Sequence, residues 1–372
     1  MKNILLVVLV ALVALSCGDR NGYVLEGDYR YAPDGTKIYL TAYDDILSVV
    51  DSTTVQGGKF VFEGISDSIS VCFLSSSNVI DGGYVVLEPG CISFSFSKGG
   101  IAGGTPLNHA VSRFMKEKER LADLGVFSSQ GVIGRLNVEE HMADSVRALA
   151  GIANAVFGAY AIKNIKDNLD NPLGCFFFVH SVGVVAPGEL SQVAELIPVK
   201  YRGRLYAPKK RQLEQEISAL SYASYAEAGA LETAVGKKYQ NFELKNLDGA
   251  NVLMSDRVSK NKYTLLFFWA SWNSESLESL DVLKKVYSGY SDKGFDIVAV
   301  SLDSSVGRCR SAVDAYRLPW LQLCNPGGGS SELAAAYGVT SLPYWVLINK
   351  EGTIILRTAS VADVEKKLSE VF

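Results

Sequence analysis

The sequence predicts a multidomain α+β protein: an antiparallel β sandwich or barrel, then a helical region, then an α/β domain. Three hydrophobic patterns lead to this prediction. From about residue 23 to 97, short runs of β-branched and aromatic residues alternate with turn residues. From about residue 107, apolar residues recur every three or four positions, which is typical of helices. From about residue 233, buried strand-like runs alternate with amphipathic stretches, which indicates an α/β domain.

The chain is long enough for this division, because 372 residues of which 48% are hydrophobic supply cores for more than one domain. Within the β region, "VDSTTVQGGKFVFEG" predicts a hairpin around Gly57 and Gly58. The expected segments are a leader at 1–17, a tether at 18–22, the β domain at 23–108, the helical region at 109–232 and the α/β domain at 233–372.

The first residues carry a targeting signal. An uncharged apolar run from Ile4 to Leu15 follows Lys2, and it is too short to span a bilayer. The run ends in Ser16-Cys17, which resembles the lipobox of bacterial lipoproteins. That resemblance implies cleavage before Cys17, a lipid on its thiol and a place in the cell envelope, at the periplasmic face or the outer membrane. The alternative is an ordinary secretory signal in which the cysteine is incidental.

Composition and motifs exclude several classes of function. A net charge of −4 gives no general attraction to nucleic acid, so we expect no nucleic-acid partner. The three histidines lie far apart and none has the spacing of metal ligands, so we expect no metal and no cofactor. The glycine-rich "PGGGSS" at 326–331 lacks the lysine of a phosphate-binding loop and is interpreted as a flexible loop.

The α/β region contains a strand, a tight turn flanked by tryptophans and a helix, in "YTLLFFWASWNSESLESLDVLKKVY". With "GKKYQNFELKNLDGANVLMSD", "GFDIVAVSLD" and "YGVTSLPYWVLINKEG", it resembles the TlpA/ResA and AhpC/TSA branch of the thioredoxin superfamily over about 140 residues. The amino half, with "VLEPGCISFSF" and "GGTPLN", resembles the domain of unknown function that precedes such domains in Bacteroidetes envelope lipoproteins.

The resemblance implies thiol–disulfide exchange by two cysteines at the start of the helix, and this sequence lacks both. Asn273 stands at the position of the attacking cysteine and Ser276 at that of the resolving cysteine. Asparagine is a strong N-cap, and Glu275 and Glu278 place negative charge near the positive end of the helix. We therefore expect a stable helix start without redox chemistry.

Leu342-Pro343 matches the cis-proline turn that the family places opposite the redox motif. The resemblance implies that extended peptides pair with the backbone there. Trp269 and Trp272 either line such a groove or cover the domain core, and the turn itself is either a binding element or simply required by the fold.

The remaining cysteines leave alternatives open. Cys309 and Cys324 lie in a helix and a following strand of the same domain, and they are buried free thiols, a structural disulfide or a relocated redox pair. Cys72, Cys91 and Cys175 are expected in the core.

We therefore expect an envelope lipoprotein that is redox-inactive at the usual site and acts as a binding or scaffold module. Its expected partners are the membrane, through the lipid anchor, and envelope proteins or extended peptides. The alternative is a periplasmic thiol–disulfide oxidoreductase or thiol antioxidant that uses Cys309 and Cys324. A third possibility is that the α/β domain only supports the β domain.

Overall fold

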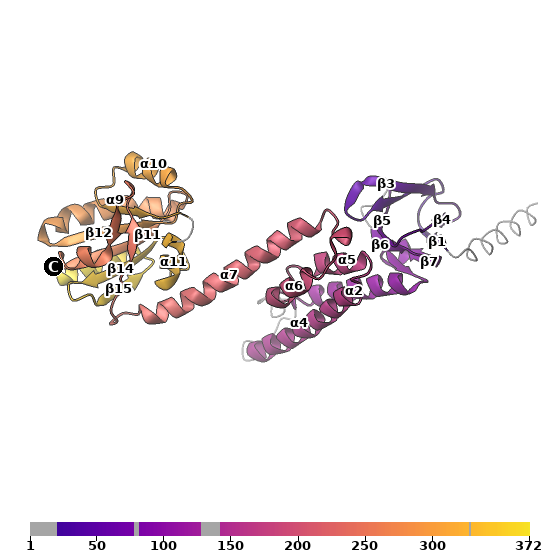
Figure 1. The fold of residues 1–372 in the computed structure, drawn as a ribbon, viewed down its shortest axis with the longest axis horizontal. Coiled ribbons are helices and arrows are strands. Elements are labelled where there is room, and N and C mark those ends of the chain that lie inside the picture. The colour runs from indigo at the N-terminus through magenta and orange to yellow at the C-terminus, as the bar shows by residue number, and fades with distance from the viewer. Residues whose placement is uncertain (1–20, 78–81, 128–141, 327–328) are drawn as a thin grey trace, which may run out of the picture. The chain divides into compact units, whose positions relative to one another are not determined.

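The protein is described by a computed structural model in which two compact units follow each other, the first ending at Ile217 and the second beginning at Ser218 (Figure 1). The structure describes residues 21–77, 82–127, 142–326 and 329–372. The predicted leader, most of the tether and Cys17 lie outside the described residues.

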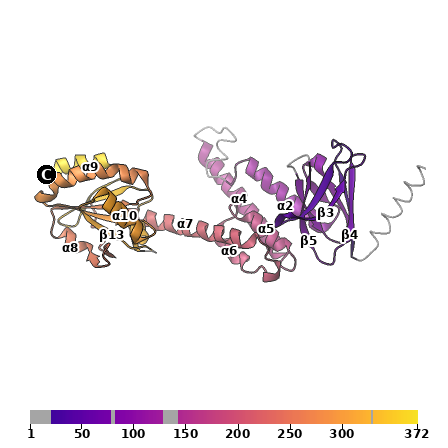
Figure 2. The same cartoon turned by 90° about the horizontal axis from the view of Figure 1, so that it is seen from above.

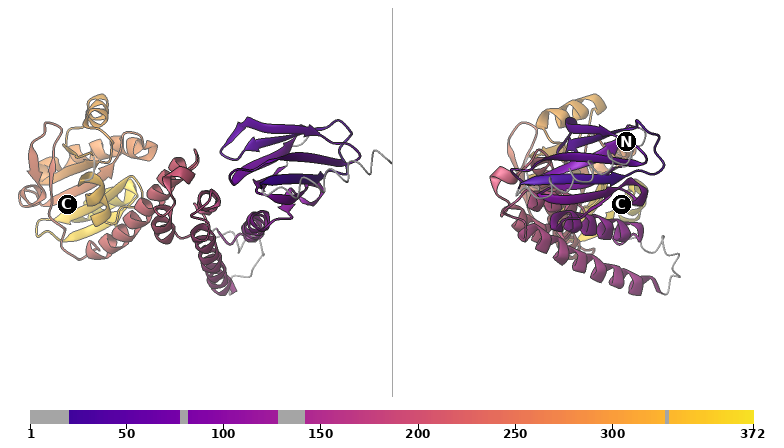
Figure 3. Two further views of the ribbon diagram at one scale, coloured as in Figure 1. Left: turned by 45° about the vertical axis from the view of Figure 1, so that its right-hand side comes forward. Right: turned by 90° about the vertical axis from the view of Figure 1, so that its right-hand side faces the viewer.

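Two four-stranded sheets form the β part of the first unit, and their strands are the broad arrows of Figure 3. One sheet has the order β4-β1-β7-β8 and the other β3-β2-β5-β6. Their inward side chains, such as Leu25 and Phe62 from one sheet and Leu40 and Leu74 from the other, share a single core, which confirms the predicted sandwich. The strands are β1 (Gly22–Asp28), β2 (Lys37–Ala42), β3 (Asp45–Thr54), β4 (Lys59–Ile65), β5 (Ser70–Ser76), β6 (Gly82–Leu87), β7 (Gly90–Ser95) and β8 (Ile101–Gly103).

Two details of the sandwich differ from the sequence prediction. The sheets are not wholly antiparallel, because β1 pairs with β7 in parallel register. The expected hairpin around Gly57 and Gly58 is limited to one antiparallel bridge between Gln56 and Lys59, because β3 and β4 belong to different sheets. A local pattern of two strand runs around a Gly-Gly turn does not distinguish a hairpin from a crossing between the layers, because both require the same turn.

The helices of the first unit pack against the β region and form a hydrophobic cluster separate from the core of the sandwich. The start of α2 is fixed by Asn108, whose side chain accepts a hydrogen bond from the Val86 amide at 2.8 Å and donates one to the Val86 carbonyl at 2.7 Å. Val86 lies in the same hydrophobic cluster as Phe114, Phe177 and many other helical residues. The β region and the helices up to Ile217 therefore form one unit. These helices are α2 (Pro106–Asp123), α4 (Ala143–Lys166), α5 (Leu173–Ser181) and α6 (Pro187–Ala194).

Two of these helices are strongly apolar. The segment "CFFFVH" lies in α5, in which eight of nine residues are buried. Among the described helices, α4 alone has the length and composition that crossing a bilayer requires, a test that core helices also pass. In this structure Phe157, Ala161 and Ile165 of α4 belong to the core of the unit.

The second unit has a five-stranded sheet of order β13-β12-β11-β14-β15 with helices on both faces (Figure 2). The β11–β12 and β12–β13 pairs are parallel, and the β11–β14 and β14–β15 pairs are antiparallel. This arrangement agrees with the thioredoxin-like fold that the sequence resemblance implies, and β9 and β10 form a hairpin around Gly249. The strands are β9 (Glu243–Lys245), β10 (Asn251–Leu253), β11 (Tyr263–Trp269), β12 (Phe295–Ser301), β13 (Leu321–Cys324), β14 (Tyr344–Asn349) and β15 (Ile354–Thr358).

The helices of this unit lie over two hydrophobic clusters, one on each face of the sheet. Part of the segment interpreted as a flexible loop is helical, because α11 begins at Gly329. The helices are α8 (Met254–Val258), α9 (Ser274–Tyr290), α10 (Val306–Tyr316), α11 (Gly329–Ala336) and α12 (Val361–Val371).

A long helix, α7 (Tyr206–Glu232), contributes its last turns to the second unit. Gly229 and Gly338 permit close contact there, because a Cβ on Gly338 would lie 2.5 Å from Cβ of Ala230. The Arg357 guanidinium then donates to the carbonyl oxygens of Ala230, at 2.6 Å, and Tyr337, at 2.5 Å. The half-buried Arg357 side chain therefore satisfies carbonyls near the ends of two helices.

Candidate functional site at the carboxyl end of the central sheet

The turn between β11 and α9 separates two tryptophans with opposite environments. Trp269 is fully buried, and its indole Nε1 donates to Oε1 of Gln322 at 3.2 Å. Trp272 is 63% exposed. The sequence left both residues as groove or core candidates, and the structure places Trp269 in the core and Trp272 on the surface.

Asn273 is the N-cap of α9, as predicted. Its side chain accepts a hydrogen bond from the backbone amide of Ser276 at 2.7 Å, which satisfies one of the amides that a helix start leaves without a partner. Ser276 is fully buried, and within the described part of the chain its hydroxyl has no hydrogen-bond partner. Neither side chain supplies a thiolate, so this turn cannot exchange electrons with a disulfide.

The Leu342–Pro343 peptide bond is cis, as the sequence predicted. Its position follows from the strand register, because Phe268 of β11 pairs with Tyr344 of β14. The segment that follows β11 and the segment that precedes β14 therefore lie at the same end of the paired strands, where β11 ends and β14 begins. Pro343 is buried and Leu342 packs partly against the core. Trp272 is therefore the large apolar side chain that is exposed at this end of the strands.

Asp303, which the sequence reasoning missed, holds the turn in place. It is 3% exposed and accepts hydrogen bonds from the Ser271 hydroxyl at 2.7 Å and from the Ser271 amide at 3.2 Å. The Ser301 hydroxyl donates to the same carboxylate at 2.8 Å. The available signal was an acidic residue directly after a buried parallel strand, at the carboxyl edge where α/β proteins place their sites.

The structure brings Cys309 and Cys324 together behind this turn. Cys309 lies in the second turn of α10 and Cys324 is the last residue of β13, and both are almost completely buried. Both belong to one hydrophobic cluster, and their thiols lie close enough to interact with each other and with the Ser301 hydroxyl. Through Ser301, Asp303 and Ser271, polar contacts connect the thiol pair to the start of α9.

The two thiols do not ionise equally. The Cys309 thiol donates to the Cys324 sulfur, so this hydrogen bond, assisted by burial, raises the pKa of Cys309. The same hydrogen bond and that of the Ser301 hydroxyl lower the pKa of Cys324. Cys324 is therefore the first of the pair to become a thiolate. The Ser301 hydroxyl has a single hydrogen, which it gives either to Asp303 or to the sulfur.

Of the other three cysteines that were expected in the core, two are buried and one is exposed. Cys72 and Cys175 are buried free thiols, as expected. Cys91 is not a core residue, because its side chain is exposed. Strand alternation explains its exposure, since Ile92 and Phe94 of the same strand fill the sandwich core. Among the described residues, no group of three or more His, Cys, Asp or Glu side chains is placed to hold a metal ion.

Comparison with known families identifies two regions of the chain. A family described as "Thioredoxin-like" matches residues 261–354, and a domain of unknown function, DUF4369, matches residues 23–111. The second match accords with the expected domain of unknown function in the amino half.

Individual relatives match the second unit. A thiol-disulfide oxidoreductase, ResA, from Bacillus thuringiensis subsp. konkukian is 30% identical over 121 residues, which are 32% of this chain and 67% of the relative. The thioredoxin-like protein YneN of Bacillus subtilis is 30% identical over 139 residues, 36% of this chain and 78% of the relative. A solved thiol-disulfide oxidoreductase from Bacteroides fragilis is 32% identical, with a TM-score of 0.35, over 37% of this chain and all of that one. Through its second unit, the chain belongs to the thioredoxin-like family.

Proposed function

We propose that the second unit is a thiol–disulfide domain in which Cys309 and Cys324, and not residues 273 and 276, form and release a disulfide. The observation that carries this proposal is that the two free, buried thiols lie together in one cluster of the second unit. The relatives that are named thiol-disulfide oxidoreductases support the same class of reaction.

The reaction balances with a small or protein disulfide as oxidant. The Cys324 thiolate attacks one sulfur of that disulfide and expels the other as a thiolate, which takes up a proton. Cys309 then loses its proton and displaces the second sulfur, so the Cys309–Cys324 disulfide forms and two thiols of the partner are released. Both cysteines are buried, so α10 must move for the partner to reach them, and we expect slow exchange.

Thiol counting on the native full chain, after equilibration with mixtures of reduced and oxidised glutathione, tests this function. We expect two thiols to disappear together at one buffer potential, and mass mapping to place the disulfide between Cys309 and Cys324. The Cys309→Ser variant should lose this transition, whereas Cys72→Ser, which changes another buried thiol, should keep it. If all four thiols stay reduced in oxidising buffer, or if Cys309→Ser leaves the transition intact, the proposal is wrong.

A second candidate function is the binding of extended peptides at the turn before α9. The exposed Trp272 at the edge where β11 and β14 end favours it. Main-chain hydrogen bonds need no sulfur, so peptide binding can persist without redox chemistry. Trp272→Ala should abolish amide chemical-shift changes on titration with an extended apolar peptide, and Tyr225→Ala, which removes another exposed aromatic, should not. Shifts that are absent or survive in Trp272→Ala would exclude this site.

We also propose that the protein works in the cell envelope, held by a lipid on Cys17. The apolar run that ends in Ser16-Cys17 supports this proposal. Cys17→Ala should release the protein from membranes or block its processing. An unlipidated mature N-terminus at another residue, found by mass spectrometry, would contradict the anchor.

A further inference from the structure

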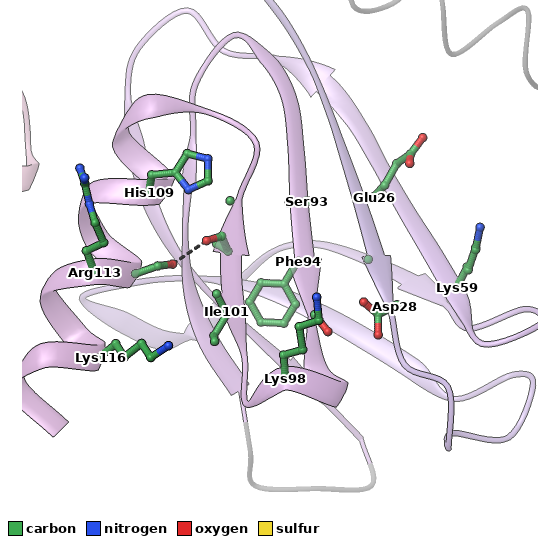
Figure 4. A pocket seen from close by; sticks show the side chains of 15 residues that line it. Glu26, Asp28, Lys59, Ser93, Phe94, Lys98, Ile101, His109, Arg113 and Lys116 are labelled. Atoms are coloured by element: carbon green, nitrogen blue, oxygen red, sulfur yellow. Dashed lines mark hydrogen bonds between the residues drawn. The ribbon is translucent and has the colours of Figure 1, made fainter. Parts of the chain in front are cut away.

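The first unit contains a hollow of about 540 Å³ on the outward face of the β4-β1-β7-β8 sheet. Strands β1, β7 and β8 form its floor and α2 forms one wall. Figure 4 shows His109, Arg113 and Lys116 on the α2 side, and Glu26, Asp28 and Lys59 on the strands of the other side. The volume lies in the range of sites for small molecules, roughly 300–1,000 Å³.

The floor is polar because the strands alternate. Ile92 of β7 points into the sandwich core, so Ser93 and Ser95 lie on the opposite face. In the parallel pairing, Glu26 of β1 is next to Ser93 and Asp28 is next to Ser95. Two carboxylates and two hydroxyls therefore form neighbouring pairs on the floor.

The Ser95 hydroxyl is an independent sign of a ligand. Ser95 lines the hollow and is only 8% exposed, yet within the described residues its hydroxyl oxygen has no hydrogen-bond partner. A buried hydroxyl without a partner is unfavourable. Its oxygen is not accessible in the conformation of this structure, so a polar group of a bound molecule would remove this cost once the Ser95 side chain rotates toward the hollow.

The wall is one face of α2, while the opposite face anchors the helix. Side chains at a spacing of three and four residues line the hollow: His109, Ser112, Arg113 and Lys116. Asn108, Val111 and Phe114 on the other face are buried against the β layers and the helical core. The wall is therefore rigidly held, as a binding site requires.

Positive charge exceeds negative charge in the hollow. Four cationic side chains line it, Lys59, Lys98, Arg113 and Lys116, against the two carboxylates of Glu26 and Asp28. In the parts of the chain that the structure describes, none of these six side chains forms an ion pair within the protein. Their charges therefore remain available to a ligand.

Gly103 leaves space in the hollow between α2 and β7. A Cβ at this position would lie 3.2 Å from Cε1 of His109 and 3.3 Å from Oγ of Ser93. Any side chain larger than a methyl group would therefore occupy the space between α2 and β7.

We propose that this hollow binds an anionic saccharide, that is, a sugar that carries a phosphate or a carboxylate. Arg113 and Lys116 bind the anionic group, because both line the hollow on the α2 side and carry charged donors. Glu26 and Asp28 would repel a simple anion but accept hydrogen bonds from sugar hydroxyls. The half-exposed Ile101 supplies an apolar surface for a sugar ring. This site lies in the first unit and is independent of the thiol pair.

Calorimetric titration of the full chain at low ionic strength tests the proposal with four probes: glucose 6-phosphate, glucuronate, glucose and inorganic phosphate. We expect at least one of the two acidic sugars to bind more tightly than both glucose and inorganic phosphate. The acidic sugar that binds more tightly identifies the anionic group as phosphate or carboxylate. If neither acidic sugar binds at millimolar concentration, or if inorganic phosphate binds equally well, the proposal is overturned.

Three variants locate the binding. Lys116→Gln should weaken the affinity for the acidic sugar about tenfold or more, since charge-assisted hydrogen bonds are strong. Lys37→Gln, which removes an exposed lysine of the other sheet, should change it little. Ser95→Ala should weaken binding without lowering the melting temperature, because the hydroxyl has no protein partner. Equal effects of Lys116→Gln and Lys37→Gln, or undiminished binding in Ser95→Ala, would contradict the site.

Discussion

The starts of α9 and α10 in the second unit differ in what they offer to chemistry. Both helices are capped by a side chain, Asn273 in α9 and Ser305 in α10. The start of α9 lies next to the exposed Trp272 but has no sulfur, whereas α10 carries Cys309 in the interior, against Cys324.

The difference teaches that exposure and reactivity have separated in this domain. An attacking cysteine needs both access and a helix N-terminus or similar positive environment that stabilises its thiolate. The turn before α9 keeps the access and the helix end. The thiol pair supplies the sulfur atoms but is buried, and hydrogen bonds lower the pKa of Cys324. The connection through Ser301, Asp303 and Ser271 joins the two places.

The largest expected effect comes from returning sulfur to the exposed helix start. In a Cys309→Ser background, Asn273→Cys with Ser276→Cys should create insulin-disulfide reductase activity, because a cysteine at a helix N-terminus has a pKa as low as about 3.5–7.5. The matched control is Asn273→Ala with Ser276→Ala, which loses the cap without gaining sulfur. A folded double-cysteine variant without activity would show that the turn lacks more than its thiols.

The next effect is on stability. A disulfide between Cys309 and Cys324 closes a loop of about 15 residues, for which chain entropy predicts about 3 kcal/mol of stabilisation. All four tryptophans lie in the second unit, so their fluorescence reports its urea unfolding. We expect a higher midpoint in oxidising buffer for the wild type and for Cys175→Ser. An equal increase in Cys309→Ser would disprove the assignment.

A smaller effect on stability is expected when the N-caps of α9 and α10 are removed in turn. Asn273→Ala should lower the free energy of unfolding by about 1 kcal/mol, as loss of an N-cap does. Ser305→Ala should cost less, because its cap hydrogen bond to the Arg308 amide is 3.3 Å long, against 2.7 Å for Asn273. Asn273→Asp, which keeps an acceptor at the cap, should be nearly neutral. If Ser305→Ala is the more costly change, hydrogen-bond length does not rank the two helix starts.

The smallest effect concerns pH. A hydrogen bond from Cys309, and then one from Ser301, lowers the pKa of Cys324. Ser301→Ala removes the second donor, so the pKa of Cys324 should rise and less thiolate should be present at a given pH. The rate of disulfide formation with oxidised glutathione should therefore shift to higher pH, while Ser301→Thr should retain the wild-type profile. An unshifted profile in a folded Ser301→Ala variant would exclude Ser301 from the chemistry.

The sequence predicted those features that local patterns determine. The succession of strands and helices in the second unit follows from apolar runs and turn residues, and the Asn273 cap follows from the residue type at a helix start. The cis bond before Pro343 was predicted through resemblance to a family.

Features that depend on contacts between distant segments were not predicted. The Asp303–Ser271 contact joins residues 32 positions apart, and the place of Asp303 after a buried strand does not identify its partner. The crossing from β3 to β4 and the parallel β1–β7 pair depend on which strands meet in space. The sequence offered three alternatives for Cys309 and Cys324, and only the fold shows that their thiols touch.

The attachment of α7 to the second unit has a consequence for modularity. A cut at residue 233, where the sequence places the domain boundary, would remove the Ala230 carbonyl that Arg357 binds and the helix surface against which Gly338 packs. A gene fusion or recombination event that exchanges the thioredoxin-like module intact must therefore carry the end of the preceding helix, from about Ser218, as part of the module.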